Sequence, residues 1–196
     1  LIRLDTNRGY VIGTNRGWQA AVNDYILIST NDVALSKSCI GRLARVLDND
    51  KQVGWVCAHY QHERAGIPDY STRFPEDVLS ECNDSHGANR ERLNAWAAQL
   101  ADIEPPYPAH AMTEATVFMV RKKTSDAIGE YWEDLTYYHT HDYGKRLASA
   151  GWIMTSHPHA VFWHDPSHPT IRLVTGSIVS EGIERSQKLY NERYNI

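Results

Sequence analysis

Residues 25–32 of the chain read YILISTND, an apolar run followed at once by the polar residues Thr30, Asn31 and Asp32. A short, continuous apolar run is typical of a strand that is buried on both faces of a sheet. In open α/β sheets, ligands bind beyond the carboxyl ends of the strands. The stretch therefore predicts a buried strand over 25–29 whose carboxyl end presents Asn31 and Asp32 to a candidate ligand site.

Helical and strand patterns alternate on both sides of this stretch. We expect strands over 1–4, 53–58, 115–121, 153–156 and 160–163, and helices over 17–23, 36–47, 90–100, 124–128, 141–150 and 186–194. Residues 7–17 are rich in Asn and Gly and are expected to form loop and turn. The alternation predicts an α/β fold with a mainly parallel sheet flanked by helices.

The chain has 196 residues, which is enough for a single domain with its own core. We therefore expect one domain over 1–196. Residues 59–112 show weaker periodicity and include the run PPYP. We expect them to form an inserted, partly mobile connection, of the kind that often serves as a binding loop.

Composition and charge exclude several classes of protein. The net charge is −4, so no basic face for nucleic acid is indicated. No apolar run approaches the ~20 residues of a membrane span, and the first residues lack the apolar core of a secretory signal. The three cysteines, Cys39, Cys57 and Cys82, form no CxxC pair. They favour a reducing, cytoplasmic compartment over a disulfide scaffold.

Two NxG units, Asn7-Arg8-Gly9 and Asn15-Arg16-Gly17, are eight residues apart. Asn and Gly tolerate the left-handed backbone conformations that let a chain approach a ligand closely. Two tight turns without a ligand are the alternative. Asp32 likewise has two interpretations. An acidic residue at a strand end can hold a hard divalent cation, or it can simply form a turn or a helix cap.

Histidines are concentrated in the last third of the chain. His139 and His141 are two residues apart, as are His157 and His159, and His164 and His168 follow. Residues i and i+2 of a strand share a face, so such pairs could bind zinc, although no HExxH motif or Cys partner accompanies them. Exposed histidines around turns are the alternative, which we favour for His157, His159 and His168. An imidazole is also a candidate proton acceptor.

Taken in order, these segments resemble glycosyltransferase family 2, which has the GT-A fold. The family commonly reads NxGxxxxxNxGxxxAxGxYxxxLNxD, and this chain reads NRGYVIGTNRGWQAAVNDYILISTND. A later family pattern, GxxDExFxxYxEDxDxxxRLxxAGW, corresponds here to GEYWEDLTYYHTHDYGKRLASAGW, and a final PxAxVxH element ends at His164. The resemblance covers about two-thirds of the chain and implies a GT-A-like, Rossmann-like α/β fold.

The resemblance also implies roles for individual residues. Asp32 stands at the position of the metal-binding acid of the family, and His164 at that of a second ligand for the metal or the diphosphate. The implied cofactor is Mn²⁺ or Mg²⁺, acting as a Lewis acid on the leaving nucleoside diphosphate. The residues implied to shape the nucleotide-sugar site are Asn7, Gly9, Asn15, Gly17 and Asn31.

The chain departs from the family at the position of the general base, where His139-Thr140 replaces the usual acidic pair. Asp142, the next family carboxylate, is our first candidate for the base, and His139 or His141 could substitute. Glu133-Asp134 matches an earlier element of the pattern, so we expect a structural or acceptor-facing role there.

A second departure lies at the front. The family begins with a strand, a helix and a second strand that read the nucleobase, and only six residues precede Asn7 here. A βαβ unit takes ~30 residues or more. We therefore expect the chain to lack the N-terminal βα nucleobase-binding segment, through truncation or with completion by another subunit in a homo-oligomer.

The function implied by the resemblance is metal-dependent, inverting transfer of a sugar from a nucleoside-diphosphate-sugar donor to an acceptor hydroxyl. The acceptor would be a saccharide or a lipid-linked molecule in polysaccharide biosynthesis, at a cytoplasmic site that is free or peripheral to the inner face of a membrane. A binding module of the same fold without turnover, motivated by the missing base, is one alternative. A zinc hydrolase built on the His pairs is another.

Overall fold

The computed structural model describes residues 1–59, 88–106, 116–164 and 176–196. It contains one five-stranded sheet with the strand order β1-β4-β3-β5-β2. The strands are β1 (Tyr25–Ser29), β2 (Val33–Leu35), β3 (Val53–His59), β4 (Val117–Arg121) and β5 (Ile153–His164). The helices are α1 (Gly9–Ala20), α2 (Cys39–Asn49), α4 (Ala88–Ala97), α5 (Lys122–Ile128), α6 (His139–Ser149) and α8 (Gly176–Tyr194).

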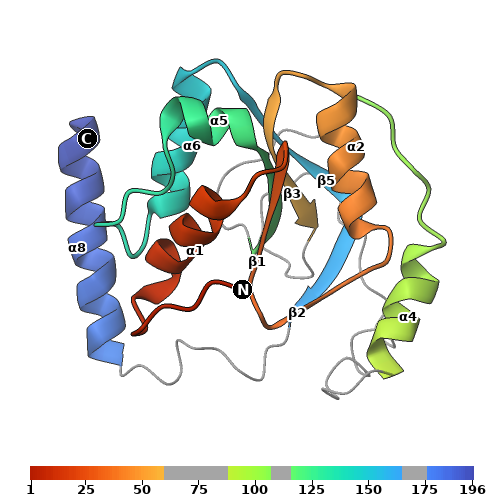
Figure 1. Ribbon diagram of the computed structural model, residues 1–196, viewed down its shortest axis with the longest axis horizontal. Coiled ribbons are helices and arrows are strands. Elements are labelled where there is room, and N and C mark those ends of the chain that lie inside the picture. Colours follow the sequence, from red (N-terminus) through yellow and green to blue (C-terminus); the bar gives the residue numbers. More distant parts are fainter. Residues whose placement is uncertain (60–87, 107–115, 165–175) are drawn as a thin grey trace.

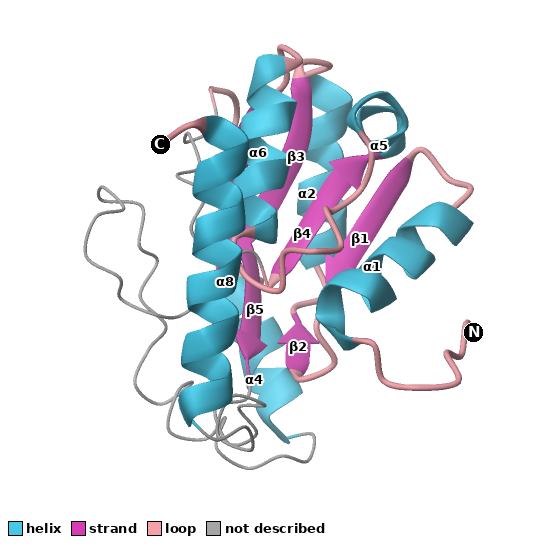
Figure 2. Cartoon of the chain, turned by 90° about the vertical axis from the view of Figure 1, so that its left-hand side faces the viewer, coloured by secondary structure: helices cyan, strands magenta, loops and turns pink. Residues whose placement is uncertain are grey.

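The sheet is mixed, so the expectation of a mainly parallel sheet is wrong. Among the strands of the described ranges, only β3 and β5 run parallel to each other. The pairs β1–β4, β3–β4 and β2–β5 are antiparallel. The α/β class itself is confirmed, because helices lie on both faces of the sheet (Figures 1 and 2).

Most of the buried aromatic side chains among the described residues lie on the α1 and α6 side of the sheet. Trp18 from α1 packs against Tyr143 from α6, which packs against Trp55 of β3. The Trp55 and Phe118 rings stack with centroids 4.0 Å apart. These large rings attach α1 and α6 firmly to the sheet, since each buried aromatic removes a large apolar area from water.

The opposite face is covered by α2. Leu43, Val46 and Leu47 of α2 are fully buried against Val56 and Met119 of the sheet. The helix predicted over 36–47 is thus confirmed as α2, although Ile40 on this helix is 46% exposed. Among the described residues, no helix combines the length and the apolar composition that a membrane span requires.

Several local predictions differ from the structure, including the helix expected over 17–23, because α1 ends at Ala20. Residues 1–4 form no strand, and α1 occupies most of the segment expected to be loop and turn. One side of α1 faces the protein interior, because Val11, Asn15 and Trp18 are at helical spacing and are all buried. The two strands expected at 153–156 and 160–163 are one strand, β5, which continues past Pro158 through a shift in its pairing with β3. A proline is tolerated in a strand at such an irregularity.

The predicted segment 59–112 is described only over residues 59 and 88–106. There α4 begins at Ala88, close to the helix expected over 90–100. The side chain of Asn94 accepts a hydrogen bond from the backbone N–H of Lys37 at 2.8 Å, and Val161 of β5 packs with Leu93. This helix therefore lies against the β2–β5 end of the sheet (Figure 1).

Candidate functional site

A cavity of about 540 Å³ lies between α1 and the edge strand β1. Its lining on α1 includes Tyr10, Thr14 and Trp18, and its lining on the sheet runs along β1 into the loop that carries Asn31 and Asp32. Gly13 and Gly17 also line it, and a Cβ atom added at either glycine would meet open space. The glycines of α1 thus leave room for a ligand beside the strand end predicted to hold one.

Asp32, which lines this cavity, lies next to His164. The antiparallel pairing of β2 with β5 places Val33 opposite His164, so the residue before β2 reaches the last residue of β5. Nε2 of His164 lies 3.2 Å from Oδ2 of Asp32, and both side chains are about three-quarters buried. The two metal ligands implied by the sequence resemblance are therefore neighbours.

The environment of Asp32 favours its ionised form. Burial raises the pKa of this carboxyl, but neighbouring groups, including the charge of His164, lower it by more, so the pKa lies below its ordinary value. Its second oxygen, Oδ1, is buried and has no hydrogen-bond partner within the described part of the chain. A buried, charged oxygen without a partner is costly unless a cation or donor reaches it.

This donor set fits a divalent cation that is shared with a substrate. Mg²⁺ keeps several waters and takes one or two carboxylates together with substrate phosphates, and Mn²⁺ accepts carboxylate and imidazole ligands. Over the described ranges, no three His, Cys, Asp or Glu side chains gather to form a metal cage. Asp32 and His164 would therefore hold the cation only in part, and the diphosphate would supply further oxygens.

The other residues implied to bind the nucleotide sugar fall into three groups, of which Asn15 alone forms the third. Gly17 and Asn31 line the cavity. Asn7 and Gly9 lie at the exposed start of α1, where Oδ1 of Asn7 accepts a hydrogen bond from the N–H of Gly9 at 2.9 Å and Gly9 has a φ of 83°. Their geometry is that of a helix start, and neither is among the residues that line the cavity.

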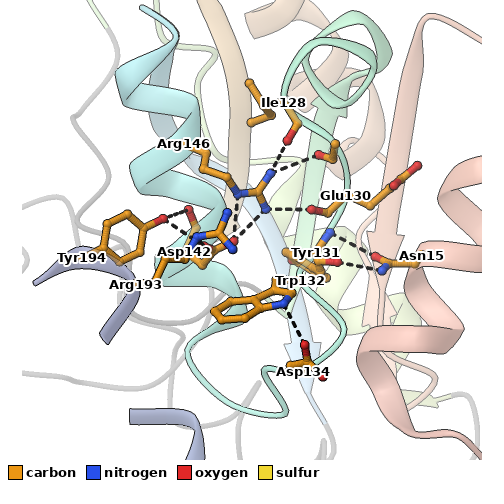
Figure 3. A network of polar contacts seen from close by, with 11 residues as sticks. Asn15, Ile128, Glu130, Tyr131, Trp132, Asp134, Asp142, Arg146, Arg193 and Tyr194 are labelled. Carbon is orange, nitrogen blue, oxygen red and sulfur yellow. Dashed lines mark hydrogen bonds and ion pairs between the residues drawn. The ribbon is translucent and has the colours of Figure 1, made fainter. Parts of the chain in front are cut away.

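Asn15 points away from the cavity, into the protein. It is 2% exposed, its Nδ2 donates to the carbonyl of Tyr131 at 2.8 Å, and its Oδ1 accepts from the N–H of Tyr131 at 3.1 Å. This two-bond clamp joins α1 to residues 129–138, here called the 129–138 loop, which connects α5 to α6 (Figure 3). Asn15 thus fixes the position of α1, which lines the cavity, by binding the 129–138 loop on the other side of the helix.

Asp142, the first candidate for the general base, lies in a buried ion-pair network (Figure 3). Its side chain is fully buried, and Nε of Arg146 donates to Oδ2 at 2.8 Å. On the other side, Arg193 lies 3.2 Å from Oδ1, and the hydroxyl of Tyr194 donates to the same oxygen at 2.9 Å. Both oxygens are occupied by cationic or hydroxyl donors, so this geometry is that of a structural carboxylate.

His139 is placed differently, beside the aromatic wall of the cavity. Its ring centroid lies 5.4 Å from that of Tyr10 and 4.8 Å from that of Tyr131. Nδ1 lies 3.1 Å from the carbonyl oxygen of Thr136. Because a carbonyl can only accept, Nδ1 carries the proton in this contact and Nε2 keeps its lone pair. Burial lowers the pKa of His139 to about 4, so the ring is neutral at physiological pH.

His141, the third candidate, faces the opposite side of α6. Its ring packs near those of Tyr138 and Tyr190, with centroids 5.4 and 6.3 Å away. Tyr190 belongs to α8, so His141 lies in the contact between α6 and α8. The cavity lining contains none of these three residues.

His157 and His159 belong to a structural cluster around the buried side chain of Arg42. The guanidinium donates to the carbonyls of His159 and Leu100, each at 2.6 Å, and to Oδ1 of Asp102 at 3.0 Å. Nδ1 of His157 accepts from the N–H of His159 at 3.1 Å. These contacts attach the segment after α4 to β5 and do not gather zinc ligands. His168 lies outside the described residues.

The sequence interpretation missed Tyr10, Thr14 and Trp18, because residues 7–17 were expected to form turns. Their positions at i, i+4 and i+8 place them on one face of a helix, and that spacing is visible in the sequence. Tyr131 was missed because its partner Asn15 is far away in the sequence.

Comparison with known proteins agrees with these observations. The model of a protein family described as glycosyl transferase family 2 matches residues 1–107, which is more than half of the chain. The match contains α1, β1 and Asp32, and His164 lies outside it. Among curated proteins, none matches the chain.

Proposed function

The chain belongs to glycosyltransferase family 2, and on that premise we propose that it transfers a sugar from a nucleoside-diphosphate sugar to an acceptor hydroxyl, with inversion. The observation that carries the proposal is the Asp32–His164 pair, of which Asp32 lines the cavity beside β1. The proposed acceptor is a saccharide or a lipid-linked saccharide.

In this proposal the cavity between α1 and β1 receives part of the donor. Gly13 and Gly17 leave space for it, and Tyr10, a residue that is 40% exposed, offers an aromatic side chain on which a sugar or base can stack. Asn31 provides an amide at the phosphate end. Asp32 and His164 would hold Mn²⁺ or Mg²⁺ against the diphosphate. The bound metal would stabilise the negative charge that develops on the leaving diphosphate.

Among the three candidates, the contacts favour His139 as the proton acceptor. Its ring lies beside Tyr10 of the cavity lining, and its Nε2 keeps a lone pair. Both oxygens of Asp142 are occupied, and His141 lies in the contact between α6 and α8. The acceptor oxygen would form a bond to the anomeric carbon while the bond from that carbon to the diphosphate oxygen breaks. The hydroxyl proton would pass to Nε2 of His139. A positioned base of this kind contributes typically ~10²–10⁴-fold to the rate.

A second candidate function is a nucleotide- or sugar-binding module without turnover. It is favoured by one observation, the enclosure of Asp142 in its ion pairs, which leaves no exposed carboxylate at that position. The two functions differ only in the chemical step, so both predict binding at the cavity.

Product formation separates the two functions. The intact chain would be incubated with a panel of UDP- and GDP-sugars, with Mn²⁺ or Mg²⁺, and with saccharide and lipid-linked acceptors. Glycosyltransferase function predicts transfer, or slow donor hydrolysis in the absence of acceptor, that stops when EDTA is added. A well-folded chain that binds nucleotide but produces neither reaction with any donor supports the binding module.

A further inference from the structure

The 129–138 loop presents two carboxylates to solvent, Glu133 and Asp134, although the residues around them are held firmly. On one side, Asn15 of α1 binds both backbone groups of Tyr131. On another side, the guanidinium of Arg146 donates to the backbone carbonyls of Ile128, Gly129 and Glu130. The loop is therefore fixed to α1 and to α6 at its beginning.

The rest of the loop is held by α8. The guanidinium of Arg193 lies over the ring of Trp132, 4.6 Å from its centroid, while its Nε reaches Oδ1 of Asp142 at 3.2 Å. The indole N–H of Trp132 in turn donates to Oδ2 of Asp134 at 2.9 Å. Arg193 thus connects the buried charge of Asp142 to the part of the loop that carries the exposed carboxylates (Figure 3).

A second contact with α8 holds the end of the loop. The N–H of Tyr137 donates to Oγ of the buried Ser186 at 3.1 Å. Gly182 lies directly against the Tyr137 ring, where an added Cβ would come within 3.1 Å of Cε2. Tyr138, which has a φ of 62°, packs on Tyr190. Tyr137 and Tyr138, which make these contacts, come directly before His139, the proposed base.

We propose that α8 positions the 129–138 loop for the acceptor, with Arg193 as the positioning residue. This proposal rests on the proposed glycosyl transfer. The loop approaches the cavity at Tyr131, whose ring centroid lies 6.5 Å from that of Tyr10 in the cavity lining, and Glu133 follows two residues later. The loop also leads directly into His139. A loop that carries an exposed acid and ends at the base is suited to orient an acceptor hydroxyl, and α8 determines its geometry without touching the donor cavity.

The test compares Arg193→Ala and Arg193→Lys with Arg185→Ala. Arg185 is exposed on the same helix, so the control removes the same charge without disturbing the loop. For Arg193→Ala we expect a rise in acceptor KM and a fall in kcat, together at least about 10-fold in kcat/KM, because small misplacements are costly. Donor affinity, measured by calorimetry, should be unchanged. Lysine keeps the positive charge over the indole and should restore part of the loss.

Hydrogen–deuterium exchange tests the positioning without any substrate. In Arg193→Ala, peptides from 129–138 should exchange at least about 10-fold faster than in the wild type, while peptides from β3 and β4 are unchanged. Unaltered exchange in the loop would overturn the proposal whether or not the chain transfers sugar. Faster exchange in a chain with no transferase activity would keep α8 as the support of the loop and would reject glycosyl transfer, and with it the acceptor role.

The proposal would also be overturned if Arg193→Ala caused equal losses of donor affinity, acceptor affinity and thermal stability, because such losses would show a general loss of structure. The same conclusion would follow if Arg185→Ala had the same effect as Arg193→Ala.

Discussion

Nε2 of His164 lies 3.2 Å from Oδ2 of Asp32, although one residue ends β5 and the other precedes β2. The short antiparallel ladder between these strands, with Val33 opposite His164, brings them together. The contact makes the candidate metal site depend on the mixed character of the sheet. If β2 ran parallel to β5, the residue that precedes β2 would lie at the start of β5 and not beside His164 at its end.

The assignment of the base to His139 predicts a specific kinetic defect. His139→Gln should lower kcat by about 10²-fold or more and leave donor affinity unchanged, because the amide cannot take the proton. Steady-state kinetics with saturating donor would measure this. His141→Gln is the comparison, since His141 packs on Tyr138 and Tyr190. A larger defect in His141→Gln than in His139→Gln would contradict the assignment.

Asp142 is predicted to contribute mainly to stability. Asp142→Asn would leave Arg146 and Arg193 around a neutral group and should lower the free energy of unfolding by about 3 kcal/mol or more. Urea denaturation would measure the change. Asp126→Asn is the control, because Asp126 is 60% exposed in an i,i+4 pair with Lys122 and should cost only about 0.5 kcal/mol. Equal, small losses in both variants would show that the network around Asp142 is not a buried one.

The stability of the chain should fall as the solution becomes mildly acidic. Burial, then the charge of Arg42, lowers the pKa of His157 to about 4, whereas an unfolded histidine titrates near 6.5. Between these values the unfolded state takes up a proton and the folded state does not, so the free energy of unfolding falls as pH drops from about 6.5 to about 4. His139, with a pKa of about 4, contributes in the same direction.

Thermal unfolding at several pH values would test this dependence. In His157→Gln, the fall between pH 6.5 and 4 should be smaller than in the wild type. Carboxylates with lowered pKa, such as Asp102, lose their contribution below about pH 3.8, which separates them from the histidines. An identical slope in the variant and the wild type would show that His157 is not the titrating group.

Packing at Gly54 gives a prediction for the fold. A Cβ at this position would come within 2.8 Å of Cγ2 of Thr124 and 3.1 Å of Cβ of Trp152. Gly54→Ala should therefore cost about 1–3 kcal/mol of stability through overpacking. Gly41→Ala, on the exposed face of α2 where an added Cβ meets nothing, should instead stabilise by up to about 1 kcal/mol. Chemical denaturation of the two variants should give changes of opposite sign.

The sequence predicts those elements whose pattern is local. The runs YILIS and VGWVCA both form strands as predicted, but only the second is buried on both faces. In β1, which is an edge strand, Ile26 and Ile28 are buried and Ser29 is exposed. The helix that contains Leu43, Val46 and Leu47 follows from their spacing. Strand direction has no local pattern, however, so the alternation of helices and strands predicts a mainly parallel sheet where the real sheet is mixed. In the segment that forms α1, the abundance of Asn and Gly predicts turns, although Val11, Asn15 and Trp18 are at helical spacing.

The candidate site was predictable in part. The resemblance to the family pattern named Asp32 and His164, and the structure places them together. The role of Asn15 as a clamp on Tyr131 and the enclosure of Asp142 by Arg193 and Tyr194 depend on contacts between distant segments. Such contacts exist only after the sheet has brought α1, α6 and α8 together, so no local pattern could have revealed them.

The central claim, a divalent cation held by Asp32 and His164 against a nucleoside diphosphate, is tested most directly by calorimetric titration of the chain. UDP and GDP would be titrated with and without Mn²⁺ into the wild type and into Asp32→Asn. The account predicts that Mn²⁺ strengthens binding of one of the two nucleotides at least about 10-fold, and that Asp32→Asn abolishes this metal-dependent gain. Binding that is equally strong with and without Mn²⁺, and unchanged in Asp32→Asn, would contradict it.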